Sequence, residues 1–210
     1  MAAGHYFDPV PRVRSSPGTV TLVLPDGRVD LRVDRGVFSA GRVDPGTVAL
    51  LRAASPPVAA TGDHLLDLGC GYGAIACTLA RRAPAATVWA VDVNERARDL
   101  AAANAEVLGL GNVRTVAPES VPGDVRFAAV WSNPPIRIGK EALHDLLAGW
   151  LARLADEGEA WLVVQRHLGA DSLAAWLATA GWPVDRHASK QGYRILHLRA
   201  PRAADRPSAP

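Results

Sequence analysis

The sequence predicts an α/β fold in which a β-hairpin precedes a seven-stranded, mostly parallel sheet with a reversed last strand. From residue 64 onward, short apolar runs alternate with stretches of helical periodicity, and this βα repetition is typical of a doubly wound parallel sheet. Only a few residues separate the last two apolar runs, too few for a parallel crossover, so the final strand is expected to run antiparallel. The chain of 210 residues suffices for one domain with a continuous core, which we place at residues 19–200.

A hairpin and a helix are predicted before residue 64, where the alternation of strands and helices begins. Residues 19–24 and 28–33 alternate apolar and polar side chains on either side of a Pro-Asp-Gly turn, which predicts a hairpin over residues 19–34. Pro45 directly follows Asp44, and proline is favoured in the first turn of a helix. A short helix should therefore begin there.

The core of the domain is expected to extend from that helix over residues 44–199. Its apolar runs have the length of buried strands, and the stretches between them have the spacing of helices. Strands are expected at residues 64–68, 87–91, 112–116, 127–131, 159–165, 182–187 and 192–199, and helices near 73–83, 95–108, 140–154 and 170–180.

The composition excludes several classes of protein. The net charge of +2 and the pI of about 8.8 permit a phosphate-rich partner without requiring one. No apolar run is long enough to span a bilayer, and the N-terminus lacks the pattern of a secretory signal, so we expect a cytoplasmic protein without a membrane partner. The two cysteines, Cys70 and Cys77, have no CxxC partner or histidine cluster, which indicates reduced core thiols and no metal site. The Pro- and Ala-rich ends, residues 1–18 and 201–210, are expected to be mobile.

A glycine-rich turn follows the first strand of the repetition. In LLDLGCGYG, Asp67 ends the strand and three glycines, Gly69, Gly71 and Gly73, open the next helix, which lets the backbone approach a ligand across the strand ends. Asp92 ends the following strand, where a carboxylate can accept hydrogen bonds from ribose hydroxyls. The pair predicts a site for a nucleoside-like ligand.

The charge beside this turn separates two classes of cofactor. A nicotinamide cofactor would bring its pyrophosphate close to Asp67, and the two negative charges would repel. The spacing is also GxGxG rather than GxGxxG. S-adenosylmethionine carries a sulfonium and an ammonium group and no phosphate, so it fits an acidic turn. Glu119, after the third strand, is a candidate acceptor for the adenine amino group.

A stiff polar segment follows the fourth strand. Asn133, Pro134, Pro135 and Ile136 lie at the same edge of the sheet as the glycine turn. The prolines fix the backbone and remove two N–H donors, so the segment should present carbonyl oxygens beside the Asn133 amide. Such acceptors suit an NH2 group whose lone pair is delocalised into a ring, and would direct that lone pair at a methyl carbon. We expect these four residues to be the catalytic segment.

Several motifs together resemble a known family. GVFSAGRVDPGT, LDLGCGYGAIA, VDVNERA, SNPPIRIGK and KQGYRILHL resemble the small-domain family of S-adenosylmethionine-dependent methyltransferases, which includes the guanine-N(2) methyltransferases of small-subunit ribosomal RNA. The resemblance implies the Rossmann-like class I fold and an amine-binding role for the Asn-Pro-Pro motif. By the same match, the cofactor would be held by Asp67, Gly69, Gly71, Gly73, Asp92, Val93, Glu119 and Asn133.

The sequence departs from the family at one position of this motif. Many relatives carry an aromatic residue after Asn-Pro-Pro to stack on the target base, whereas this chain has Ile136. Related amine methyltransferases also use Asp in place of Asn, so Asn133→Asp is expected to retain partial activity. Candidate contacts to the substrate are Arg137, Lys140, Lys190 and Tyr193, and a candidate flap over the cofactor contains Phe38, Ser39, Asp44, Gly46 and Thr47.

These features predict methyl transfer from S-adenosylmethionine to an exocyclic base amine, with guanine in ribosomal RNA as the leading acceptor and RNA or a ribosomal subunit as partner. One alternative is a protein glutamine-amide methyltransferase, because that side chain also presents an NH2 group. The other is a cofactor-binding RNA assembly factor that does not catalyse transfer.

Overall fold

The computed structural model describes residues 13–201, and residues 1–12 and 202–210 lie outside the described part. Seven strands form one sheet in the order β5-β4-β3-β6-β7-β9-β8. All neighbouring pairs from β5 to β7 are parallel, whereas β9 is antiparallel to both β7 and β8. The predicted sheet with a reversed last strand is therefore confirmed. The strands are β3 (His64–Leu68), β4 (Thr87–Val91), β5 (Val113–Val116), β6 (Phe127–Ser132), β7 (Leu154–Gln165), β8 (Val184–Lys190) and β9 (Tyr193–Arg199).

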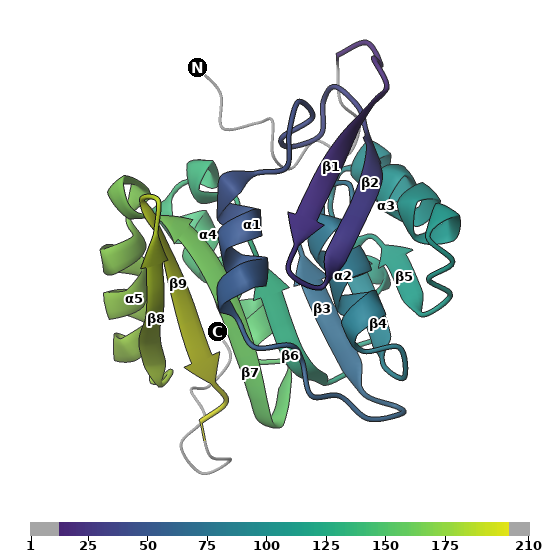
Figure 1. Ribbon diagram of the computed structural model, residues 1–210. Helices are drawn as coiled ribbons and strands as arrows, with labels where there is room; N and C mark the ends of the chain where they lie inside the picture. Colours follow the sequence, from purple (N-terminus) through teal and green to yellow (C-terminus); the bar gives the residue numbers. More distant parts are fainter. Residues whose placement is uncertain (1–12, 202–210) are drawn as a thin grey trace.

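Helices cover both faces of this sheet (Figure 1). Helices α1 (Pro45–Ala53), α2 (Ala74–Arg82) and α3 (Glu95–Val107) share one apolar core with alternate strand residues such as Leu65 and Val163. Helices α4 (Lys140–Leu151) and α5 (Ala170–Thr179) share the other core, to which the intervening strand residues contribute. Because successive side chains on a strand point to opposite faces, strands with few polar residues supply both layers.

The order of the strands reverses beside β3. The chain passes from β3 outward to β5 and then returns to β6 on the other side of β3. In open α/β sheets, ligands bind outside the carboxyl ends of the strands at such a switch point. The glycine turn after β3 and the Asn-Pro-Pro segment after β6 therefore meet where the fold leaves room for a ligand.

The N-terminal hairpin forms a separate two-stranded sheet of β1 (Gly18–Leu24) and β2 (Gly27–Val33). Its alternate apolar side chains are buried in the core formed with α1, α2 and α3. The buried side chain of Asn104 in α3 accepts from the Arg32 amide at 2.7 Å and donates to the carbonyls of Arg32 at 2.9 Å and Tyr72 at 2.8 Å. One amide thus ties the hairpin to the glycine turn.

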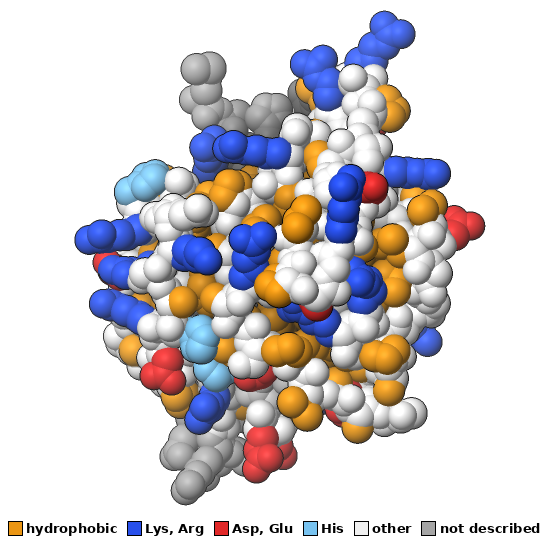
Figure 2. Space-filling view, viewed as in Figure 1, with side chains coloured by type: hydrophobic (Ala, Val, Ile, Leu, Met, Phe, Trp, Pro, Cys, Tyr) orange, Lys and Arg blue, Asp and Glu red, His pale blue; other side chains and the backbone are white. Residues whose placement is uncertain are grey.

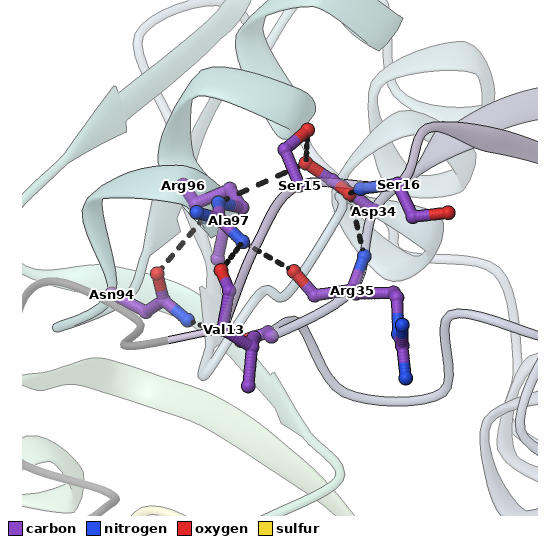
Figure 3. Close-up of polar contacts among 9 residues, drawn as sticks. Val13, Ser15, Ser16, Asp34, Arg35, Asn94, Arg96 and Ala97 are labelled. Carbon is purple, nitrogen blue, oxygen red and sulfur yellow. Dashed lines mark hydrogen bonds and ion pairs between the residues drawn. The ribbon is translucent and has the colours of Figure 1, made fainter.

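The segment before the hairpin is attached to the end of β2 and to α3 (Figure 3). The Asp34 carboxylate accepts hydrogen bonds from the Ser15 hydroxyl at 2.7 Å and from the Ser16 amide. The Arg96 guanidinium donates to the carbonyls of Val13 at 3.1 Å and Arg35 at 2.6 Å. Within the stretch 1–18 that was expected to be mobile, residues 13–18 therefore have defined contacts.

Three predicted elements differ from the structure by two or more residues at a boundary. The helix expected over 140–154 ends at Leu151, and β7 begins at Leu154 rather than at residue 159. The polar residues 156–159 hid this part of the strand from the sequence analysis, because the strand is irregular there. Glu157 has a φ of 62°, and a Cβ on Gly158 would lie 2.9 Å from the Phe127 carbonyl oxygen. The strand expected at 182–187 is shifted to Val184–Lys190, because Trp182 packs into the core before the strand begins.

Candidate active site

The glycine turn after β3 has the backbone conformation that its sequence predicts. Gly69, Gly71 and Gly73 have φ values of 73°, 54° and 87°, in the left-handed region that favours glycine. The turn is fixed to the neighbouring strand, because the amides of Gly69 and Cys70 both donate to the Val91 carbonyl, at 2.8 and 3.0 Å. The third glycine also allows close packing, since a Cβ on Gly73 would lie 3.1 Å from the Ala101 Cβ.

Asp92 lies directly beside this turn. One carboxylate oxygen accepts from the Gly71 amide at 2.9 Å and the other from the Asn94 amide at 2.9 Å. Burial raises the pKa of this carboxyl above its ordinary value, although these hydrogen bonds and the nearby Arg98 oppose the shift. A carboxylate has about four acceptor positions, so Asp92 can hold the loop and still accept from a ligand hydroxyl.

Asp67 is fully buried beneath the turn. Its Oδ2 accepts from the Ala76 amide in the first turn of α2 at 2.8 Å, and Oδ1 has no hydrogen-bond partner among residues 13–201. Burial raises its pKa to about 8, and the neighbouring Asp92 adds to the shift. The structure thus places Asp67 as a support for the loop and the helix, while the contact with a cofactor that the sequence predicts stays a prediction.

Asn133 is held by the N-terminus of α1, an element far away in the sequence. Its Nδ2 donates to Asp44 Oδ2 at 2.8 Å and to Thr47 Oγ1 at 3.1 Å. The same Asp44 oxygen accepts from the Thr47 amide at 3.0 Å and caps the helix. No residue in the described part donates to Asn133 Oδ1. The amide therefore has an acceptor oxygen left for a ligand.

The prolines that follow form a tight turn. The amide of Ile136 donates to the Pro134 carbonyl at 2.8 Å, and that of Ile138 donates to the Pro135 carbonyl at 3.1 Å. The sequence predicted a rim of carbonyl acceptors, and each of these two carbonyls already accepts one hydrogen bond within the turn. Pro134 is buried, whereas Pro135 and Ile136 are half-buried. The Asn133 side-chain oxygen, by contrast, accepts no hydrogen bond from the described residues.

The predicted substrate residues surround the same edge of the sheet. Arg137 and Lys140 are exposed after β6, and Lys190 is the exposed last residue of β8, directly before the turn to β9. The amide of Arg166, at the end of β7, donates to the Gly192 carbonyl at 2.7 Å, which places that turn beside the end of β7. In the described part of the chain no hydrogen bond joins any of these cations to Asn133, so the structure gathers them at the edge without bringing them to the amide.

Tyr193 lies closer to the site than its sequence position indicated. A Cβ on Gly46 would lie 2.6 Å from the Tyr193 ring, so the ring packs directly on the first turn of α1. Burial raises the pKa of the Tyr193 hydroxyl, and the negative charge of Asp44 raises it further.

The segment between β2 and α1 crosses the edge of the sheet. Asn94 Nδ2 donates to the Gly36 carbonyl at 2.9 Å, and Val37 lies 3.9 Å from the position of a Cβ on Gly71. Phe38 is 64% exposed, and the segment then reaches Asp44 and Asn133. The residues of the predicted flap, Phe38, Ser39, Asp44, Gly46 and Thr47, lie along this path, and their role over a cofactor stays a prediction. The sequence did not predict that Asp44 and Thr47 hold the Asn133 side chain. The order Asp-Pro-Gly indicates a helix start at Asp44, but nothing in it points to Asn133.

The other predicted site residues lie around this centre. Glu119 is exposed in the short helix Pro118–Ser120 after β5, and Val93 is half-buried with its carbonyl 2.9 Å from the Arg98 guanidinium. Both cysteines are free and buried, as expected. Residues 13–201 contain no group of three side chains suited to a metal ion. Within the same range, no helix has the length and apolarity needed to cross a membrane.

This geometry agrees with a match to known proteins. The methyltransferase small domain family matches residues 28–197. The chain belongs to this family. It is 35% identical over 195 residues to the uncharacterized protein YbxB of Bacillus subtilis, which covers 91% of this chain and 96% of that protein. It is also 35% identical over 164 residues to ribosomal RNA small subunit methyltransferase C of Pseudomonas aeruginosa, which covers 71% of this chain and 48% of that one.

A solved structure shows the same relationship. The 16S rRNA N2 methyltransferase RsmC of T. thermophilus, in complex with AdoMet and guanosine, aligns with a TM-score of 0.73 at 25% identity, over 90% of this chain and 52% of that chain. The chain thus spans about half the length of the ribosomal RNA methyltransferases that it matches.

Proposed function

We propose that this protein uses S-adenosylmethionine to methylate the exocyclic N2 amine of a guanine in small-subunit ribosomal RNA. The observation that carries the proposal is the Asn133 side chain, whose NH2 group is held by Asp44 and Thr47 while its oxygen is unused. That oxygen lies at the switch point of the sheet, in a protein of the methyltransferase small domain family.

The residues of the glycine turn fit the methyl donor. Among residues 13–201, leaving out its two chain neighbours, only Val37 at 3.9 Å lies within 4 Å of the position that a Cβ on Gly71 would take, so the backbone has space for a ligand there. Asp92 accepts ribose hydroxyls beside the turn, and Asp67 beneath it, with a pKa of about 8, ionises more readily when a cation binds nearby. Two carboxyl groups next to each other favour a cationic ligand, and S-adenosylmethionine supplies an activated methyl group on a sulfonium.

Catalysis requires little acid–base chemistry from the protein. The nitrogen of a base amine becomes more positive as it accepts a methyl group, so a hydrogen bond from that amine to Asn133 Oδ1 strengthens in the transition state. Because Asp44 and Thr47 fix the amide in advance, its orientation costs nothing at the moment of reaction. The half-buried Ile136 provides apolar contact to the base.

The surface around the site suits an RNA backbone. Figure 2 shows Lys and Arg side chains spread over the face that carries α1 and the hairpin. Cations contact phosphates and position RNA without reading its sequence. The exposed cations at the carboxyl edge are Arg42, Arg137, Lys140, Arg166 and Lys190.

The test is methyl transfer to small ribosomal subunits. Subunits are purified from a strain that lacks the gene and incubated with labelled S-adenosylmethionine and the wild-type protein or Asn133→Ala. The expected result is N2-methylguanine in nucleosides digested from the subunit RNA, formed by the wild type and strongly reduced for the variant. Label in release-factor protein instead of RNA would assign glutamine-amide methylation. Donor binding without transfer to either would favour a non-catalytic assembly factor.

A further inference from the structure

The contact between Asn133 and α1 has a defined polarity. A carboxylate can only accept hydrogen bonds, so the atom of Asn133 that lies 2.8 Å from Asp44 Oδ2 must be the NH2 nitrogen. Thr47 Oγ1 takes the second hydrogen at 3.1 Å. The contact therefore fixes which end of the amide faces the protein and which faces the substrate.

Asp44 is itself held rigidly. It caps α1 and accepts from the Thr47 amide at 3.0 Å, and Thr47 is only 6% exposed. Pro45 fixes the next backbone angle. No side chain fits at Gly46, because a Cβ there would lie 2.6 Å from the Tyr193 ring and 2.8 Å from Asp44 Oδ2.

We infer that Asp44 is a positioning residue that orients the Asn133 amide and determines that the protein functions with Asn, and not Asp, at position 133. The inference rests on the proposed function, in which Asn133 Oδ1 accepts from the amine. It also confines to low pH the partial activity that the sequence analysis expects of Asn133→Asp.

A carboxylate at position 133 meets a second carboxylate. In Asn133→Asp, an oxygen replaces the nitrogen that lies 2.8 Å from Asp44 Oδ2. Two carboxylates at this distance either repel or share one proton. With a shared proton, the new side chain donates to Asp44 and still presents an acceptor to the substrate, as the native amide does. Activity should therefore survive at low pH and be lost as the pH rises and the shared proton dissociates.

The groups around Asp44 do not obscure this titration. Tyr72 in the glycine turn, Tyr193 at the start of β9 and Arg42 before α1 are the titratable groups that interact electrostatically with this region in the described chain. Burial and Asp44 raise the pKa of both tyrosines, and arginine stays charged throughout. None of the three changes its charge between pH 5 and pH 8.

The decisive experiment exchanges the two side chains. Single-turnover methylation of small ribosomal subunits is measured at pH 6 and pH 8 for the wild type, Asp44→Asn, Asn133→Asp and the double variant. At pH 8, Asn133→Asp should fall by about 10²-fold, as for the loss of one preorganised group. The double variant removes the repulsion between the two carboxylates, at the cost of the hydrogen bond from the Thr47 amide, which the nitrogen facing position 133 cannot accept. It should still recover at least about 10-fold over Asn133→Asp. The matched control combines Asn133→Asp with Asp185→Asn, which removes the same charge from an exposed site on β8 and should not restore activity.

Thermal unfolding tests the pair without any substrate. The shared proton raises a carboxyl pKa in the folded Asn133→Asp protein, so its stability relative to the wild type should fall as the pH rises from 5 to 8. The double variant should not show this fall. If the stabilities behave in this way but the wild type methylates no RNA, the pair stands and the proposed function fails. If the wild type is active, either of two results overturns the role of Asp44. One is a double variant that is no more active than Asn133→Asp at pH 8. The other is a difference in stability between Asn133→Asp and the wild type that does not depend on pH.

Discussion

The buried carboxyl of Asp67 makes the stability of this protein depend on pH. Its pKa is about 8 in the folded protein, against an ordinary value of 3.8. Because the folded state binds this proton more tightly than the unfolded state does, stability falls as the pH rises from about 4 to about 8. Each pKa unit corresponds to about 1.4 kcal/mol, so ionising Asp67 lowers the free energy of unfolding by at most about 6 kcal/mol.

Asp67→Asn should remove this dependence, because an amide does not titrate. Its oxygen can still accept from Ala76, and its NH2 group takes the place of Oδ1, which has no partner among the described residues. At pH 5 the wild-type carboxyl is protonated and presents an O–H donor at the same place, so the stabilities of the two proteins should differ by no more than the cost of one unsatisfied donor, about 1–3 kcal/mol. At pH 8.5 the wild type carries a buried charge, so the variant should be the more stable of the two.

Urea denaturation of both proteins at half-unit steps between pH 5 and pH 9 measures this directly. The exposed Asp185→Asn serves as the control and should follow the wild type at every pH. Parallel curves for Asp67→Asn and the wild type would refute the reasoning, because they would mean that Asp67 is ionised in the folded protein throughout.

Four further outcomes are expected. Asn133→Ala should lower single-turnover methylation by about 10²- to 10³-fold with unchanged donor affinity; full activity on the natural substrate would reduce the Asn-Pro-Pro segment to a rigid loop. Asp92→Ala should weaken S-adenosylmethionine binding by about 1.5–3 kcal/mol in calorimetry, and an unchanged dissociation constant would place the ribose elsewhere. Donor binding at pH 8 should release protons, because a cation lowers the pKa of about 8 that burial gives Asp67; equal binding heats in buffers of different ionisation enthalpy would contradict this. Gly73→Ala should lower the free energy of unfolding by about 1–3 kcal/mol, since φ is 87° and Ala101 is 3.1 Å from the new Cβ; an unchanged denaturation midpoint would show that the loop can adjust.

The sequence predicted those features that depend on local patterns. The apolar runs of β3 and β4 were located to the residue, because buried parallel strands carry a continuous apolar signal between polar turns. The glycines and Asp92 follow from the same local order. The start of β7 was missed because a strand irregularity breaks the alternation on which such predictions depend.

The contacts that complete the site are not local. Asp44 and Asn133 are 89 residues apart, and no periodicity links a helix cap to a strand end. The sequence likewise placed Asp67 near the cofactor without revealing that α2 covers it completely. Both cases depend on how elements pack in three dimensions, which a single sequence does not encode in any short pattern.

The Asn104 side chain limits where the chain can be truncated. It is 2% exposed and holds β2 through Arg32 and the glycine turn through Tyr72. A truncation that begins at α1 would remove the Arg32 partners and leave part of a buried amide unsatisfied beneath the turn that Asp92 also supports. The hairpin thus supports the glycine turn, and any minimal fragment or chimera made from this protein should start no later than Gly18.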